Sequence, residues 1–89
     1  MAITSFRVSV VDTPTLLVRG GSRVSYLTAK NAHASAACCL GGSLVTFAGG
    51  FSLGNGDVSN ITVAPGEEVY AVADTGITVP VHVIHQASR

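Results

Sequence analysis

The chain has 89 residues, enough for one domain and too few for two. Charged residues make up 11% of it, against about 25% in an average globular protein, and five basic side chains balance five acidic ones. This charge balance leaves almost nothing to neutralise a phosphate backbone, so we expect no binding to nucleic acid. Hydrophobic residues at 47% also exclude a disordered chain.

The residue types favour strands over helices. The chain has 13 Val, 4 Ile and 8 Thr, whereas Glu, Lys, Gln, Arg and Met together number nine. Branched side chains fit the pleated surface of a sheet, and the straight-chain set fits helices. The composition therefore predicts an all-β protein.

Alternating apolar residues and turn signals predict about seven or eight short strands. Phe6, Val8 and Val10 alternate with Arg7 and Ser9, which defines a half-buried first strand. Later strands are predicted over residues 15–19, 23–31, 36–40, 58–63, 69–73 and 79–83, with short apolar pieces at 44–47 and 51–53. Turn signals every 8 to 12 residues or so are typical of a sandwich or a small barrel.

Several single residues carry structural predictions. Gly20-Gly21 is expected to use positive φ angles in a hairpin, and Pro65-Gly66 a turn with proline second and glycine third. Pro80 cannot donate to a ladder, which predicts that the last strand lies at a sheet edge or bulge. Phe51 and Leu53 are expected in the core, as are at least three of the five aromatic side chains, which would leave no aromatic platform for a carbohydrate.

The predicted fold is a single-domain antiparallel β-sandwich, jelly-roll or Ig-like, over residues 1–89. Residues 1–11 are an N-terminal arm or first strand, and residues 86–89 a loose tail. The first residues lack a basic region followed by an apolar stretch, so we expect no secretory signal. No apolar run is long enough to cross a bilayer, so no membrane partner is expected.

The side chains that could carry chemistry are scattered. His82 and His85 are three residues apart on a strand and should face opposite sides, while His33 lies in a loop. The acids sit in or beside turns, where they commonly cap backbone groups or meet solvent. Cys38 and Cys39 should point to opposite faces as reduced thiols. We therefore expect no catalytic residues, no metal, no cofactor and no enzymatic activity.

Open sheet edges and few charges instead predict assembly with other chains. Pairing through edge strands or through the first strand would give a homo-oligomer, trimeric or higher. The residues expected at such an interface are Ile3, Phe6, Arg7, Val8, Val10, Pro80 and His82.

A succession of short motifs covers most of the chain from Leu16 onward. These motifs are Leu16-Leu17-Val18, Arg23-Val24-Ser25, Leu40-Gly41-Gly42-Ser43 with Val45-Thr46, Gly50-Phe51-Ser52-Leu53, Pro65-Gly66-Glu67 and Val69-Tyr70-Ala71-Val72. In order and spacing the chain resembles small β-sandwich virion structural proteins of tailed bacteriophages, of the capsid decoration or head-fibre kind.

That resemblance implies a capsid decoration or minor capsid protein that binds and stabilises the major capsid shell. Its partners would be the major capsid protein or other virion proteins, and it would reside in the virion, assembled in the host cytoplasm. Two alternatives are a neck, tail or fibre-base component and a small glycan-binding or adhesin module.

Overall fold

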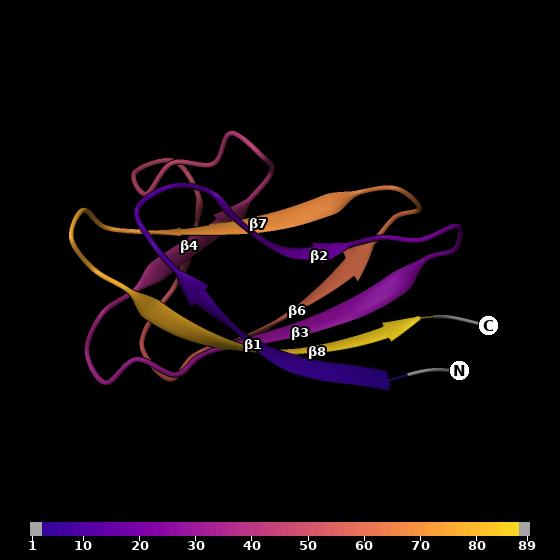
Figure 1. Ribbon diagram of the computed structural model, residues 1–89, viewed down its shortest axis with the longest axis horizontal. Coiled ribbons are helices and arrows are strands. Elements are labelled where there is room, and N and C mark those ends of the chain that lie inside the picture. The colour runs from indigo at the N-terminus through magenta and orange to yellow at the C-terminus, as the bar shows by residue number, and fades with distance from the viewer. Residues whose placement is uncertain (1–2, 88–89) are drawn as a thin grey trace.

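The computed structural model describes residues 3–87 and contains eight strands and no helix in that range (Figure 1). The strands are β1 (Ile3–Val10), β2 (Thr15–Arg19), β3 (Ser25–Asn31), β4 (Cys38–Gly41), β5 (Phe51–Leu53), β6 (Val58–Val63), β7 (Glu68–Ala73) and β8 (Val79–Ala87).

The strands form two four-stranded antiparallel sheets that lie face to face. Sheet A has the order β1-β8-β3-β6 and sheet B the order β2-β7-β4-β5. The chain crosses between the sheets at nearly every connection, so neighbours within a sheet are distant in sequence. The all-β sandwich predicted from the sequence is confirmed, and of the two predicted topologies the order is that of a jelly roll.

Most predicted strands lie where the alternation placed them, and the ends differ. The predictions for 15–19 and 58–63 match β2 and β6 residue for residue. The apolar piece at 44–47 is not a strand but part of a loop, residues 42–50, that folds over sheet B. Gln86 and Ala87 continue β8, so the loose tail predicted from residue 86 is wrong for these two residues; residues 1, 2, 88 and 89 lie outside the described range.

Pro80 corrects the prediction that the last strand is a sheet edge. β8 lies between β1 and β3, and Pro80 pairs with Ser9 of β1. The carbonyl of Pro80 accepts a hydrogen bond from the N–H of Ala32 at 2.9 Å. In an antiparallel sheet the nitrogen and the carbonyl of one residue point toward the same neighbouring strand, so the nitrogen of Pro80 also faces the β3 side. There it lies one residue beyond the end of β3. A proline is tolerated inside the sheet because its missing donor falls where the ladder has ended.

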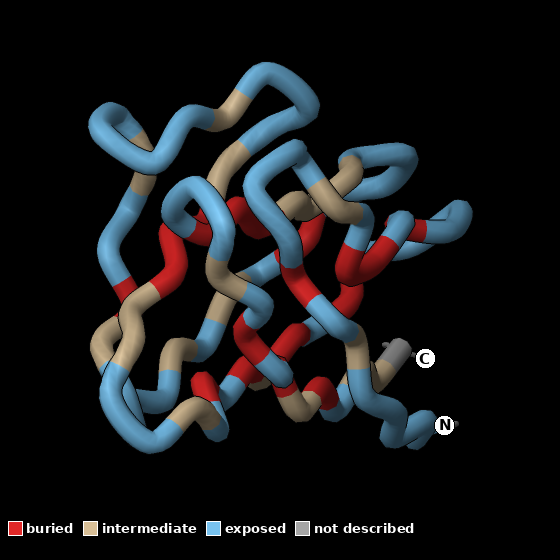
Figure 2. Tube along the Cα trace, turned by 60° about the vertical axis from the view of Figure 1, so that its left-hand side comes forward, coloured by how far each residue is buried: buried red, intermediate tan, exposed pale blue. Residues whose placement is uncertain are grey.

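The core between the sheets consists of aliphatic side chains and Cys38. Its largest fully buried side chains include Leu27 and the valines at 10, 63, 79, 81 and 83. Figure 2 marks the buried residues in red. None of the aromatic residues is buried, so the prediction that at least three point inward is wrong. Phe51 shares the inner face of β5 with Leu53, yet it is 67% exposed because β5 is the last strand of its sheet.

A buried asparagine fixes the end of the sandwich. The Nδ2 group of Asn31 donates to the carbonyls of Ala36 and Leu53 at 2.9 and 3.0 Å, and its Oδ1 accepts the N–H of His33 at 2.8 Å. Asn31 belongs to sheet A and Leu53 to sheet B, so one fully buried side chain ties both sheets to the loop of residues 32–37.

The glycines divide into two kinds. Gly66 has a φ of 76°, which confirms the Pro65-Gly66 turn. Gly20 and Gly21 have no positive φ, so that prediction is wrong. Gly20 is needed for space, because a Cβ there would lie 2.6 Å from the carbonyl oxygen of Ala64.

Candidate protein interface

The outer face of sheet A is exposed or half-buried along all four of its strands. Alternation along each strand brings the following side chains to it: Ile3, Ser5, Arg7 and Ser9 from β1, Pro80, His82, Ile84 and Gln86 from β8, Tyr26, Thr28 and Lys30 from β3, and Val58, Asn60 and Thr62 from β6. We call this surface the outer face. Sheet B differs, because the 42–50 loop packs over its outer side and buries Cys39 and Val72.

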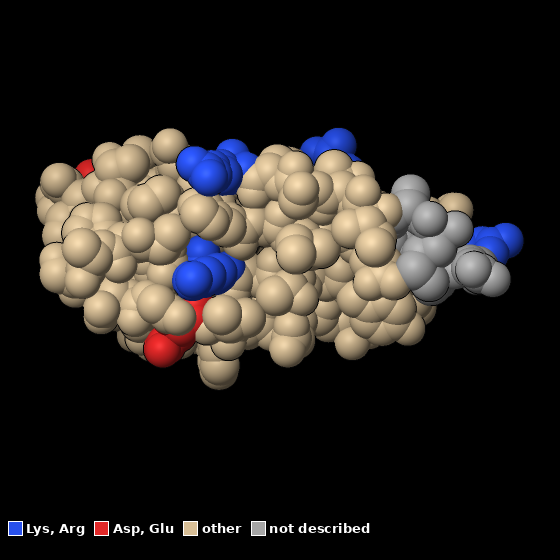
Figure 3. Space-filling view, turned by 90° about the horizontal axis from the view of Figure 1, so that it is seen from below, with Lys and Arg blue, Asp and Glu red and all other residues tan. Residues whose placement is uncertain are grey.

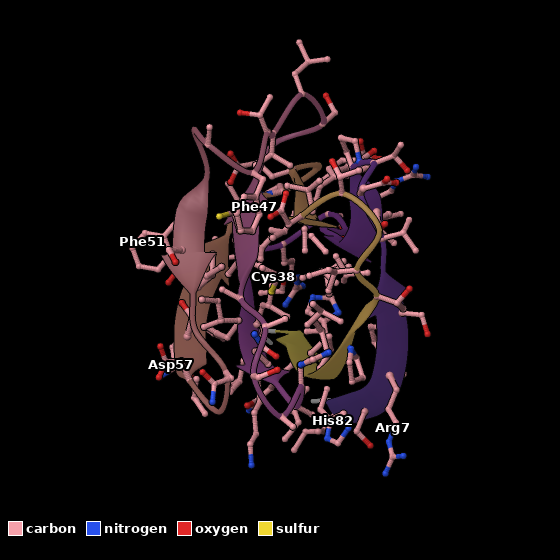
Figure 4. The ribbon with its side chains drawn as sticks, turned by 90° about the vertical axis from the view of Figure 1, so that its left-hand side faces the viewer. Arg7, Cys38, Phe47, Phe51, Asp57 and His82 are labelled. Atoms are coloured by element: carbon pink, nitrogen blue, oxygen red, sulfur yellow. The ribbon has the colours of Figure 1, made fainter. Side chains whose placement is uncertain are left out.

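Basic side chains from three strands form one row across the outer face. His82 lies opposite Arg7 on β1 and opposite Lys30 on β3, and Lys30 lies opposite Val58 on β6. Figure 4 shows Arg7 and His82 projecting together from this face. Directly opposed side chains on a sheet are about 5 Å apart, so the row places Arg7 and Lys30 roughly 10 Å apart on either side of His82.

A shallow hollow of about 460 Å³ lies over this row, and its lining includes Ser5, Thr28 and Ile84 in addition to the row itself. None of the outer-face residues is acidic. Asp57 lies at the border, and its carboxylate accepts the N–H of Gly54 in the turn before β6. Figure 3 looks onto this side: basic side chains are spread across it, an acidic group lies beside one of them, and most of the surface is uncharged. The face therefore favours an anionic partner.

Apolar side chains surround the basic row. Ile3, Tyr26, Val58 and Ile84 are between 49% and 66% exposed. Single exposed hydrophobic residues are common on any protein, whereas several on one flat sheet face next to a charged row are typical of a protein contact. Tyrosine is also among the residues enriched at the energetic centres of interfaces.

The structure divides the interface residues predicted from the sequence. Ile3, Arg7, Pro80 and His82 lie together on the outer face, where a partner could reach them. Val10 is fully buried in the core and Val8 is half-buried against it, so both are structural rather than available to a partner. Phe6 lies on the same inner side as these valines, but it is 36% exposed at the edge of the sandwich.

Ten of the fourteen outer-face residues were not predicted, among them Tyr26, Lys30, Val58 and Ile84. The alternation of buried and exposed residues along β3 and β6 carries the signal for which side chains point outward. It cannot show that β3 and β8 are neighbours, because that pairing joins segments about 50 residues apart in sequence. The row of basic residues becomes visible only with the strand order.

Several titratable groups elsewhere are engaged in structural contacts. Arg19 and Glu68, opposed on β2 and β7, form an ion pair with 2.6 Å between Nε and Oε2. The hydroxyl of Tyr70 donates to the other oxygen of Glu68 at 3.0 Å. The hydrogen bond from Arg19, and then that from Tyr70, lower the pKa of Glu68, and the bond to Glu68 raises the pKa of Tyr70.

Turn acids and His33 cap backbone groups. Glu67, Asp57 and Asp74 each accept a backbone N–H within or beside a turn, which is one of the two roles predicted for the acids. His33 accepts the N–H groups of Ser35 and Ala36 on its Nδ1, so the imidazole shapes the 32–37 loop.

Both cysteines are free and buried on opposite faces of β4, as the sequence predicts. Burial, and then the neighbouring Cys39, raise the pKa of Cys38 to about 11; burial also raises the pKa of Cys39. Thiols with raised pKa values are poor nucleophiles. Cys39 instead donates to the carbonyl of Phe47 at 3.1 Å and anchors the 42–50 loop.

In residues 3–87 no group of three His, Cys, Asp or Glu side chains is placed to hold a metal ion. The same part of the chain contains no helix long and apolar enough to cross a membrane. Comparisons of the chain with protein families, curated proteins and solved structures give no match.

Proposed function

We propose that this protein is a non-enzymatic subunit of a larger protein assembly that binds an acidic protein surface through the outer face. The observation that carries the proposal is the row of Arg7, His82 and Lys30, set among exposed apolar side chains on a sheet face without an acid. Charge complementarity would orient the partner, and burial of the apolar side chains would supply most of the binding energy.

Several acidic, thiol and imidazole side chains that could act in catalysis are held in structural contacts, which supports a non-enzymatic role. Glu67 and Glu68, the one adjacent pair of acids, are held by different partners, Ala64 and Arg19. The thiols are buried and protonated, and His33 uses its Nδ1 for the loop. A general acid or base must reach a substrate proton within about 3 Å, and none of these groups is free to do so.

The sequence motifs quoted above support a more specific proposal, in which the assembly is the virion of a tailed bacteriophage. The partner would then be the major capsid protein, and the chain would decorate and stabilise the shell. The jelly roll occurs in many viral capsid domains, which supports the proposal by analogy of fold alone.

Two measurements test these two levels separately. Co-sedimentation with shells of the major capsid protein tests the face: the Arg7→Glu, Lys30→Glu double variant should lose binding at least tenfold. Arg23→Glu, an exposed substitution in the β2–β3 turn, is the matched control and should bind as the unaltered protein does. Undiminished binding of a folded double variant would contradict the role of the outer face.

Mass spectrometry of purified virions tests the particle. The protein should be present, and a cryo-EM map should show it on the shell. Its absence from the virions would contradict the capsid assignment. Density at the neck or fibre base would contradict a position on the shell and assign the protein to that part of the particle.

A further inference from the structure

The two sheets differ in how their edges are protected. In sheet B, β5 has only three residues, and the pairing of β2 shifts register between Leu16 and Val18 next to the ion-paired Arg19. Short strands, irregular pairing and charges are the usual means of preventing edge-to-edge contact. Sheet A has longer edges: β1 pairs with β8 at eight consecutive positions without a shift, and Arg7 is its one charged residue. The β1 edge is therefore open to another strand.

The register shows which backbone groups of β1 face outward. Pro80 turns its carbonyl to Ala32 on the β3 side, so Pro80 does not exchange hydrogen bonds with Ser9. Because bonded and non-bonded pairs alternate in an antiparallel ladder, every second residue of β1 counted from Ser9 directs its N–H and C=O away from β8. These residues are Ile3, Ser5, Arg7 and Ser9.

We propose that a second copy of this chain pairs with the outer edge of β1, antiparallel to it, with Phe6 of one copy opposite Phe6 of the other. In this register Ser5 lies opposite Arg7 of the second copy and Ile3 opposite Ser9, so all four outward residues are bonded. The four pairs exchange about eight N–H···O=C hydrogen bonds, two for each pair.

Charge and side-chain contacts select this register over its neighbours. A shift by two positions in one direction places Arg7 directly opposite Arg7, and like charges in that position are destabilising. A shift in the other direction shortens the overlap. The central register keeps the two guanidinium groups apart and brings the two Phe6 rings, each 36% exposed in the single chain, into contact across the axis.

Such a dimer has a two-fold axis perpendicular to the joined sheets. Sheet A of each copy becomes half of a continuous eight-stranded sheet, and both outer faces lie on one side. An antiparallel pair of identical strands closes with two copies, in contrast to the trimer or higher assembly expected from the sequence. The inference uses the edge of sheet A, so it does not rest on the partner proposed for the face.

Cysteine crosslinking tests the register. Directly opposed residues of a non-bonded pair have Cα atoms about 4.5 Å apart, within the range for a disulfide. Phe6→Cys should therefore form a covalent dimer on mild oxidation. Ser5→Cys is the matched control, because Ser5 lies two positions from its own copy, more than about 7 Å away, and should not crosslink. Crosslinking of Ser5→Cys but not of Phe6→Cys would overturn the register.

Proline substitution and light scattering test the edge. The full chain should elute with a mass near 18 kDa, about twice its 9.0 kDa. Ser5→Pro removes an outward N–H and should give a 9.0 kDa monomer with unchanged circular dichroism, whereas Ser5→Ala should remain dimeric. A monomeric or trimeric unaltered chain, or growth into open polymers, would overturn the proposal, as would a Ser5→Pro variant that is still a dimer.

Discussion

Asn31→Ala should be among the most damaging single substitutions in this protein. The side chain is fully buried and makes three hydrogen bonds, of 2.8 to 3.0 Å, to groups in the 32–37 loop and in β5. At about 1 kcal/mol for each bond, the substitution should lower the free energy of unfolding by roughly 3 kcal/mol. For a chain of this size that corresponds to a fall of roughly 12 to 24 °C in melting temperature.

Asn55→Ala is the matched control. Asn55 is exposed, and its side chain makes a single hydrogen bond of 3.3 Å to the carbonyl of Ala34, so its loss should cost less than about 0.5 kcal/mol. Urea denaturation followed by circular dichroism measures both variants, with the slope of each transition used to verify that the denatured states are comparable. If Asn31→Ala lost less than about 1 kcal/mol, the reasoning that this side chain joins the two sheets would be refuted.

Three further predictions concern spacing, thiols and pH. Gly20→Ala should lower the free energy of unfolding by about 2 kcal/mol, because its Cβ would lie 2.6 Å from the carbonyl oxygen of Ala64. A Cβ at Gly21 would have nothing within 4 Å, so Gly21→Ala should change that free energy by less than about 1 kcal/mol. Equal effects of the two substitutions in thermal melts would contradict the steric argument. Both cysteines should resist a thiol reagent at mildly alkaline pH and react in denaturant, because burial raises both thiol pKa values, that of Cys38 to about 11. Rapid reaction of the folded chain would show that the 42–50 loop opens. The pKa of Glu68 should lie below its ordinary value of 4.5 in an NMR titration. The stability that this carboxylate contributes is therefore present above that value and is lost as the pH falls through the lowered pKa. An unchanged pKa in Arg19→Ala would contradict the assignment of the ion pair as the main cause.

The fold could be predicted as far as local patterns reach. Alternation placed β2 and β6 residue for residue, and Pro65-Gly66 identified its turn, because both depend on a few consecutive residues. Pro80 and Phe51 were predicted wrongly because their surroundings depend on strand order. A proline is tolerated next to the end of a neighbouring strand, and an inward-facing phenylalanine stays exposed on the last strand of a sheet.

The candidate interface could be predicted only in part for the same reason. The first strand and His82 were identified, but the predicted residues include both sides of β1, although alternating apolar and polar side chains predict that only one side packs on the core. Val10 proved to be buried and Arg7 exposed within one strand. Lys30 joined the site through the pairing of β3 with β8, a contact between distant segments that depends on the closure of the whole sandwich.

The two sides of the sandwich show why scarce charge need not be distributed evenly. The 42–50 loop packs over Cys39 and Val72 on the outer side of sheet B, and the Arg19–Glu68 pair and a register shift occupy its β2 edge, so these parts of sheet B are protected by structure. Within residues 3–87 the outer side of sheet A has neither a covering loop nor an ion pair, yet it carries Arg7 and Lys30, two of the five Lys and Arg residues in the chain. In this part of the single chain, these basic side chains have no acidic partner and the apolar side chains beside them are not buried. This difference between the two sheets is the strongest reason to expect that sheet A binds other proteins.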